Sequence, residues 1–251
     1  MPPRLAVRDI AKHYGGVQAL RGVTMHVDAG EVLGIVGDNG AGKSTVAKIL
    51  SGATFPSAGQ VLLDGSAVQF ANPAAARDAG VASVYQDLAL ADQRDVIANF
   101  FLGKEILSGN WIGRRLGWLD TRAMARHTVA ELARLHTRIP DVRVSARDLS
   151  GGQRQALAIA RAAGWTSKVL LLDEPTSALG VEQQQQVLDL IRRVSGEGIA
   201  VILISHQMPD VLAVCDRVVV LRLGQVAATL AGDKLTGENL VGYITGARIG
   251  G

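Results

Sequence analysis

The sequence contains a single cysteine, lacks a long apolar run and has almost no excess of charge. Cys215 alone cannot form a disulfide framework within the chain, which fits a reducing compartment. A run of about 18 apolar residues, as a membrane helix needs, is missing, and the start MPPRLAVRDI does not resemble a signal peptide. The 26 basic residues exceed the 23 acidic ones by only three, which is too few to indicate nucleic-acid binding. We therefore expect a soluble cytoplasmic domain.

The composition is otherwise that of a globular protein. Hydrophobic residues make up 48% of the 251 positions and charged residues 20%, which excludes a disordered chain. Short apolar runs between turn residues predict strands, and longer amphipathic runs predict helices. The expected strands are 5–14, 23–28, 31–37, 60–65, 81–86, 168–173, 199–205 and a pair within 216–229. The expected helices are 44–52, 121–136, 153–163 and 181–198.

Strands and helices alternate over most of the chain, and several strands are almost continuously apolar. This alternation is typical of an α/β fold with a parallel sheet covered on both faces. The middle of the chain differs, because residues 88–163 hold most of the arginines and long helix-compatible runs. We therefore expect an α/β core of residues 1–87 and 164–251 with a helical subdomain at about 88–163. We expect the run Gln183–Gln186 to be a solvated helix face.

A glycine-rich segment between an expected strand and an expected helix fits the phosphate-binding pattern GxxxxGK[ST]. Glycines allow backbone N–H groups to surround phosphate oxygens, and the helix N-terminus adds a partial positive charge. Lys43 would bring a full charge to the β- and γ-phosphates, and the Ser44 hydroxyl would ligate Mg²⁺. The alternative is a strand-to-helix turn without a ligand. The candidate nucleotide-binding residues are Gly37, Asp38, Asn39, Gly40, Ala41, Gly42, Lys43, Ser44 and Thr45.

Two carboxylates follow the apolar run from Val169 to Leu172. A buried parallel strand delivers such acids to the carboxyl edge of the sheet, where nucleotides bind in α/β proteins. Asp173 would hold Mg²⁺ directly or through its water shell, and Glu174 would polarise an attacking water. The alternative is a strand that ends in a solvated acidic turn.

The segment Leu149–Gln153 precedes an amphipathic helix. Ser150 is a plausible N-cap, and Gly151 and Gly152 leave backbone N–H groups uncovered. Such a helix start is a second candidate anion site. The alternative is an ordinary helix cap.

Taken in order, the phosphate loop, LSGGQ at 149–153, LLLDEP at 170–175 and Ser205-His206 resemble the nucleotide-binding subunit of an ABC transporter. The resemblance implies an α/β P-loop ATPase core with an N-terminal antiparallel β subdomain and an inserted helical subdomain. It also implies that Tyr14 stacks on adenine, that Gln86 reaches the metal and the water, and that His206 contacts the γ-phosphate. In this family, Ser150, Gly151, Gly152 and Gln153 contact ATP held by a second copy.

Shorter segments narrow the resemblance to ATPases of monosaccharide importers of the ribose, xylose and fructose type. These segments are GDNG at 37–40, YQDLAL at 85–90, NFFLG at 99–103 and SALGV at 177–181. Gly180 stands where most of the superfamily has aspartate, and we expect it to be a neutral position at the dimer interface with φ above zero. The chain carries one set of motifs, so the resemblance implies pairing with a second copy of itself.

The implied function is ATP hydrolysis with Mg²⁺ that drives monosaccharide uptake. The implied partners are separate transmembrane permease subunits and, indirectly, a sugar-binding protein, at the cytoplasmic face of the inner membrane. An ABC ATPase for another cargo remains open. An ABC ATPase that acts on DNA or ribosomes fits less well, because the interval from Ser44 to Leu149 is too short for a long coiled coil. Intact Glu174 and His206 weaken a third alternative, an adaptor that binds nucleotide without hydrolysis.

Overall fold

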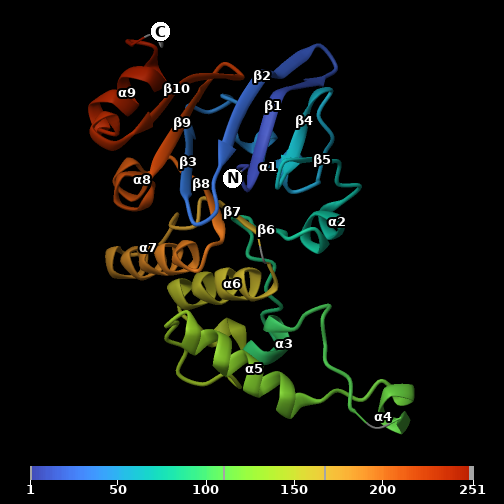
Figure 1. Ribbon diagram of the computed structural model, residues 1–251. Coiled ribbons are helices and arrows are strands. Elements are labelled where there is room, and N and C mark those ends of the chain that lie inside the picture. The colour runs from blue at the N-terminus through green and yellow to red at the C-terminus, as the bar shows by residue number, and fades with distance from the viewer. Residues whose placement is uncertain (1, 110, 167, 249–251) are drawn as a thin grey trace.

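The computed structural model describes residues 2–109, 111–166 and 168–248, and it contains two sheets (Figure 1). The antiparallel sheet has the order β2-β1-β4-β5, and the larger sheet has the order β10-β9-β3-β8-β7-β6. The first comprises β1 (Leu5–Tyr14), β2 (Val17–Val27), β4 (Ala58–Leu63) and β5 (Ser66–Val68). The second comprises β3 (Val32–Gly37), β6 (Val81–Val84), β7 (Val169–Asp173), β8 (Ala200–Ile204), β9 (Arg217–Arg222) and β10 (Gln225–Ala231).

The larger sheet is parallel from β9 to β6, and only β10 pairs antiparallel, with β9. Its central strands are apolar apart from Asp173 at the end of β7, because both of their faces are covered. The α/β fold class with an N-terminal antiparallel sheet is confirmed. The strand expected at 81–86 is shorter, because β6 lies at the sheet edge and its pairing with β7 stops at Val84.

Nine α-helices lie within the described residues, and the four expected helices are among them with ends shifted by a few residues. They are α1 (Lys43–Leu50), α2 (Pro73–Asp78), α3 (Val96–Phe100), α4 (Trp111–Leu116), α5 (Thr121–Arg134), α6 (Gly151–Trp165), α7 (Val181–Gly196), α8 (Met208–Val214) and α9 (Gly237–Thr245). Two short 3₁₀ turns are at Ala146–Asp148 and Gly232–Lys234. None of these helices has the length and apolarity needed to cross a bilayer.

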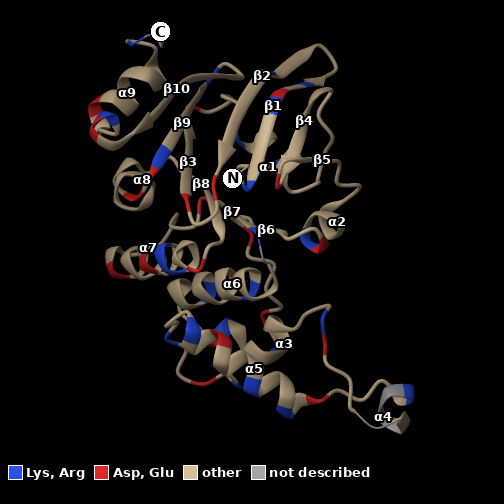
Figure 2. Cartoon of the chain, in the orientation of Figure 1, with Lys and Arg blue, Asp and Glu red and all other residues tan. Residues whose placement is uncertain are grey.

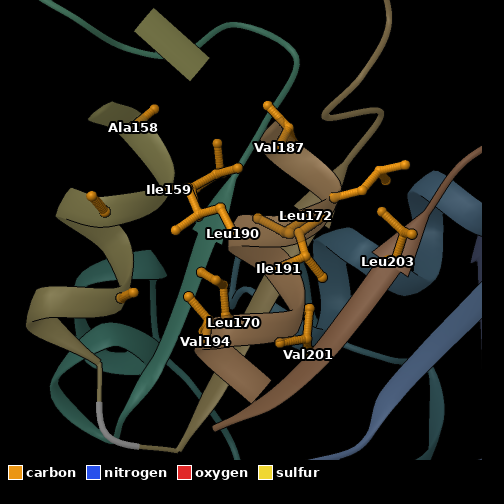
Figure 3. Packing of buried hydrophobic residues seen from close by; sticks show 14 of the residues in the cluster. Ala158, Ile159, Leu170, Leu172, Val187, Leu190, Ile191, Val194, Val201 and Leu203 are labelled. Carbon is orange, nitrogen blue, oxygen red and sulfur yellow. The ribbon is translucent and has the colours of Figure 1, made fainter. Parts of the chain in front are cut away.

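Two apolar cores cover the two faces of the larger sheet. Alternate residues of β7 show the division, because Leu170 and Leu172 belong to one core and Leu171 belongs to the other. The first core packs α6 and α7 against β7 and β8, with Ile159 and Ile191 at its centre (Figure 3). The second core fills the space between the larger sheet, α1 and the antiparallel sheet. The larger sheet is therefore held on both faces by packed side chains.

The helices α3, α5 and α6 meet below the larger sheet in the view of Figure 1. Phe100, Phe101, His127 and Trp165 join them in one aromatic cluster, with ring centroids 5.3–6.0 Å apart. The indole N–H of Trp165 donates to the Phe100 carbonyl at 2.9 Å, so the buried polar atom is satisfied. The short helix α4 stands away from this cluster at the end of an extended segment.

A buried asparagine shapes the entry into α3. The Asn99 side chain is fully buried, and its Oδ1 accepts a hydrogen bond from the backbone N–H of Ala91 at 2.7 Å. Its Nδ2 donates to the carbonyls of Ala91, Arg94 and Asp95 at 3.0–3.1 Å. One side chain thus replaces the regular pairing that the loop before α3 lacks.

We expect Asn99→Ala to lower the free energy of unfolding by about 2–4 kcal/mol, because it leaves several buried backbone groups without a partner. Urea denaturation of the full chain measures this change. Asn239→Ala is the matched control, since Asn239 is half-buried and donates to the Lys234 carbonyl, and it should cost less than about 1 kcal/mol. Equal, small costs for both variants would contradict the role of Asn99.

Candidate functional site

The carboxyl ends of three parallel strands form the candidate site. In the ladder, Ile204 of β8 pairs with Ile35 of β3 on one side and with Asp173 of β7 on the other. The residues that follow these positions therefore leave the sheet at the same edge. They include the phosphate loop after β3, Glu174 after β7, and Ser205 and His206 after β8.

The phosphate loop is a tight turn that only glycine can make at two of its positions. Gly37 has a φ of 152° and Gly42 a φ of 107°. A Cβ on Gly37 would lie 2.2 Å from the Leu221 carbonyl oxygen, and one on Gly42 would lie 2.6 Å from the Leu20 side chain. The conformation of the loop therefore depends on glycine at both positions, as is typical of phosphate-binding turns.

Lys43 begins α1 and lies over this loop. Its ammonium group donates to the Gly37 carbonyl at 2.8 Å and to the Asp38 carbonyl at 3.1 Å. Ser44 and Thr45 follow in the first turn of α1, where Ser44 is exposed and the Thr45 N–H bonds the Gly42 carbonyl. Charge, hydroxyl and helix N-terminus therefore lie beside one another.

Glu174 and His206 contact each other at the sheet edge. The Nδ1 of His206 lies 2.8 Å from Oε1 of Glu174. The Glu174 backbone has a φ of 52° and its N–H donates to the Ile204 carbonyl at 2.9 Å, which fixes the turn after β7. The other carboxylate oxygen, Oε2, is buried and has no hydrogen-bond partner among the described residues. A buried acceptor without a partner is costly, so this oxygen fits a role toward a bound water or substrate.

Asp173 is half-buried, and its neighbours shift the pKa of its carboxyl group in opposite directions. Burial raises the pKa of its carboxyl group, the charge of Glu174 raises it further, and the ammonium group of Lys43 acts in the opposite direction. The two acids therefore repel each other when both are ionised. A cation placed between them and the phosphate oxygens would relieve this repulsion.

The donor set fits Mg²⁺ bound together with a nucleotide rather than a metal held by protein alone. Among the described residues, no group of three or more His, Cys, Asp and Glu side chains gathers as a metal site. Mg²⁺ in nucleotide sites usually takes one or two protein oxygens, water and substrate phosphates. The Ser44 hydroxyl and the Asp173 carboxylate are such oxygens, beside a loop in which Gly37 and Gly42 have no room for a Cβ.

Gln86 lies outside β6, in the exposed loop that follows it. Sequence reasoning missed the residue that holds this loop. Arg161 of α6 donates to the carbonyls of Leu88 at 2.9 Å and Ala89 at 3.0 Å. The loop that carries Gln86 is thus tied to α6, the helix that begins at LSGGQ.

Tyr14 ends β1 and is 46% exposed, with the Lys12 ammonium 5.1 Å from its ring centroid. Lys12 pairs with Leu20 across the hairpin, and Leu20 packs against the phosphate-loop residue Gly42. The hairpin that carries Tyr14 therefore lies against the phosphate loop. An exposed aromatic face there is suited to stacking on a planar base.

The LSGGQ segment forms a complete helix cap. The Ser150 hydroxyl accepts from the Gln153 N–H, and the Gln153 side chain accepts from the Ser150 N–H. A Cβ on Gly152 would lie 2.9 Å from Gln183, and one on Gly151 would lie 3.4 Å from Leu179. The neighbours of these glycines come from α7 and the segment before it, whereas Gly42 of the phosphate loop faces Ala19, Leu20 and Gly224.

One expectation about the start of α7 is wrong, namely that Gly180 has a positive φ. Gly180 caps the helix with a φ of −71°, and among the described residues no atom lies within 4 Å of the Cβ that a side chain would add. The left-handed conformation is taken two residues earlier, by Ala178 with a φ of 65°. Conformation and space therefore do not require glycine at position 180.

The glutamine run is only half solvated. Gln185 and Gln186 are exposed, but Gln183 packs on Gly152 and is partly buried. Gln184 is also partly buried, and its Nε2 donates to Oε1 of Gln207 at 3.3 Å. Gln207 follows His206 directly, so α7 contacts the segment that carries this histidine, which the sequence pattern did not indicate.

Residues 20–177 match the sequence model of a family described as ABC transporter. The fructose import ATP-binding protein FrcA of Rhizobium meliloti is 42% identical over 98% of this chain and 95% of its own length. The ribose import ATP-binding protein RbsA of Burkholderia pseudomallei is 43% identical over the whole chain, which spans 48% of that relative. The solved structure of MJ1267, an ATP-binding cassette of an ABC transporter, is 24% identical and aligns over the whole of both chains with a TM-score of 0.83, which bears on the fold.

The repulsion at Asp173 gives a prediction about stability. Because its pKa is raised, the folded chain holds the proton more tightly than the unfolded chain does, and ionisation above the ordinary aspartate pKa costs stability. We expect Asp173→Asn to raise the melting temperature at pH 7 by roughly 1–2 °C. The gain should shrink as the pH falls through the raised pKa of the native carboxyl group, because the native protein then takes up the proton and no longer bears the cost of ionisation.

Calorimetry of both proteins across this pH range tests the expectation. Asp28→Asn removes the same charge from an exposed position and serves as the control, with little change expected. A lower melting temperature for Asp173→Asn at pH 7 would show that the carboxylate stabilises the fold.

Proposed function

The chain belongs to the ABC transporter family, as one of its ATPase subunits, and from this premise we propose that it drives uptake of a monosaccharide through separate permease subunits. The similarity to fructose and ribose import proteins, at 42–43% identity, supports a sugar as the cargo. Which sugar is carried depends on other subunits, because the site described above has the character of a nucleotide site. We propose the cytoplasmic face of the inner membrane as its place of action.

We assign nucleotide binding to the phosphate loop and the β1–β2 hairpin. The open backbone from Gly37 to Gly42 and the Lys43 ammonium bind the phosphates, and Tyr14 stacks on the base. Ser44, Asp173 and Gln86 hold Mg²⁺, which when bound neutralises charge on the phosphate oxygens. Ser44 is next to Lys43 in the chain, and Asp173 is close enough to Lys43 for the two charges to interact. This proximity supports the grouping of Ser44 and Asp173 at one metal site. Gln86 would reach the same Mg²⁺ from the loop that follows β6.

The observation that carries the hydrolytic role is the geometry of Glu174. His206 contacts one carboxylate oxygen at 2.8 Å, while the other is buried and finds no partner in the part of the chain that the structure describes. The free oxygen accepts a proton from a water that attacks the γ-phosphate, and the fixed turn after β7 keeps it in place. His206, 67% exposed, reaches outward to the γ-phosphate.

We propose that two copies of the chain pack head to tail around the nucleotide. The LSGGQ turn presents a capped helix N-terminus, and its glycine neighbours belong to α7 and the segment before it rather than to the chain's own phosphate loop. Ser150, Gly151, Gly152 and Gln153 are therefore free to contact a triphosphate held by the second copy. Gly180 keeps added negative charge out of this interface.

A cavity of about 310 Å³ is the place where we expect a permease segment to bind. It is lined by Pro73 of α2, Tyr85 and Ala89 of the loop around Gln86, and Trp165 of α6. Tyr85 and Ala89 belong to the same loop as Gln86. Movement of a segment bound in this cavity would therefore shift Gln86 at the nucleotide. Arg161 lines the same cavity and holds the loop to α6. A permease segment bound there would therefore move the loop and α6 together.

The test is ATPase activity of the chain reconstituted with the permease and binding protein of its own transport system, screened over monosaccharides. We expect one sugar to raise the activity several-fold, since transport couples cargo binding to turnover. Glu174→Gln is the matched control: the amide keeps the size of the side chain but cannot accept a proton, so turnover should fall at least about a hundredfold. Nucleotide binding by this variant, measured by calorimetry, should persist.

Two results would contradict the proposal. Stimulation by a cargo other than a sugar would agree with the ATPase assignment but contradict the assignment of a sugar as the cargo. Native turnover in Glu174→Gln would remove Glu174 from the hydrolytic step.

A further inference from the structure

Between α3 and α5 the described residues 104–109 and 111–120 form a projecting hairpin, which we call the arm. Its two sides are joined by the isolated bridge between Leu107 and Leu119. The Ser108 N–H donates to the Trp118 carbonyl and the Asp120 N–H donates to the Ile106 carbonyl, each at 2.7 Å. The arm extends away from the aromatic cluster and ends in α4 (Figure 1).

The arm exposes large apolar side chains. Trp111 is 76% exposed and Trp118 is 59% exposed, and they are two of the three tryptophans in the chain. Leu107, Leu116 and Leu119 are exposed beside them. A monomer in water rarely leaves such a group uncovered, so the arm is suited to contact another surface.

The arm and the first turns of α5 also concentrate the positive charge of the chain. Residues 104–126 contain five basic and two acidic residues, a net charge of +3 that equals that of the whole sequence. The remaining 228 positions therefore sum to zero. Arg115 in the arm and Arg122 in α5 are exposed, and Figure 2 shows basic residues at α4 and along the start of α5.

The base of the arm adjoins the cavity assigned above to the permease. Leu102 and Lys104 line that cavity, and the Lys104 ammonium lies 5.0 Å from the Trp165 ring centroid. A permease segment bound in this cavity would place the base of the arm beside the permease. The arm would then lie near the surrounding bilayer. The cytoplasmic leaflet carries negative charge, which complements the arginines.

We propose that the arm binds the anionic lipid surface beside the permease, an inference that rests on the proposed function. Tryptophan and leucine side chains enter the interfacial region, and arginine side chains pair with lipid phosphates. Lipid is favoured over a permease segment because the apolar side chains stand on a projecting tip together with the charge, which is the pattern of interfacial binding.

The test is binding of the purified full chain, without permease, to vesicles of phosphatidylcholine with and without phosphatidylglycerol. Sedimentation should show binding that depends on phosphatidylglycerol and falls with added salt. Tryptophan emission should shift to the blue on binding, since Trp111 and Trp118 leave water. The double variant Trp111→Ala/Trp118→Ala should bind at least about tenfold more weakly.

Charge reversal separates the arm from the rest of the surface. Arg115→Glu/Arg122→Glu should weaken vesicle binding at least about tenfold. Arg8→Glu/Arg21→Glu makes the same change in net charge at exposed positions of β1 and β2 and serves as the matched control, with near-native binding expected. Equal loss in both double variants would overturn the inference.

Further outcomes distinguish this inference from the proposed function. Binding only to vesicles that contain the permease, regardless of lipid charge, would overturn the lipid contact and assign the arm to a protein partner. Native vesicle binding by Trp111→Ala/Trp118→Ala would also overturn it. A chain that binds anionic vesicles through the arm but shows no sugar-stimulated ATPase would support the lipid contact and contradict the proposed function.

Discussion

The parallel pairing of β3, β8 and β7 is the constraint on which the rest of the molecule depends. It places Gly37, Asp173 and Ser205 at one sheet edge, although they are far apart in the sequence. Two apolar cores, one on each face, hold that edge rigid. The cost of the arrangement is local: two acids are adjacent, the Asp173 pKa is raised, and one buried oxygen of Glu174 has no partner within the described residues. Such local cost at a sheet edge is typical of a functional site.

The helical part of the chain connects this edge to the surroundings. Helix α6 begins at the LSGGQ cap, holds the Gln86 loop through Arg161, and ends at Trp165 beside the cavity. In our proposal one helix thus contacts the second copy at its start and the permease near its end. Gln184 adds a link from α7 to the segment of His206. The arm extends the same side of the molecule toward the lipid surface.

Much of the architecture could be predicted, because apolar periodicity, glycine positions and helix caps are local properties. The continuous apolar runs of β3, β7 and β8 predict a sheet covered on both faces, and Ser150 is the cap that its sequence indicates. Contacts between distant segments could not be predicted. The partial burial of Gln183 depends on where α6 lies, and that of Gln184 on where Gln207 lies. The hold of Arg161 on a loop depends on tertiary packing, and the left-handed residue before α7 is Ala178 rather than Gly180.

The central claim is that each ATP lies between the phosphate loop of one copy and the LSGGQ turn of the other. Its most direct test mixes two inactive variants. Lys43→Ala disables the loop, and Gly151→Asp places a negative charge at the turn, where the nearest atom to an added Cβ is 3.4 Å away. A mixed dimer contains one site built from an intact loop and an intact turn, so the mixture should hydrolyse ATP although neither variant does. If the mixture stays inactive while both variants fold and exchange partners, each copy uses its own turn, and the account is contradicted.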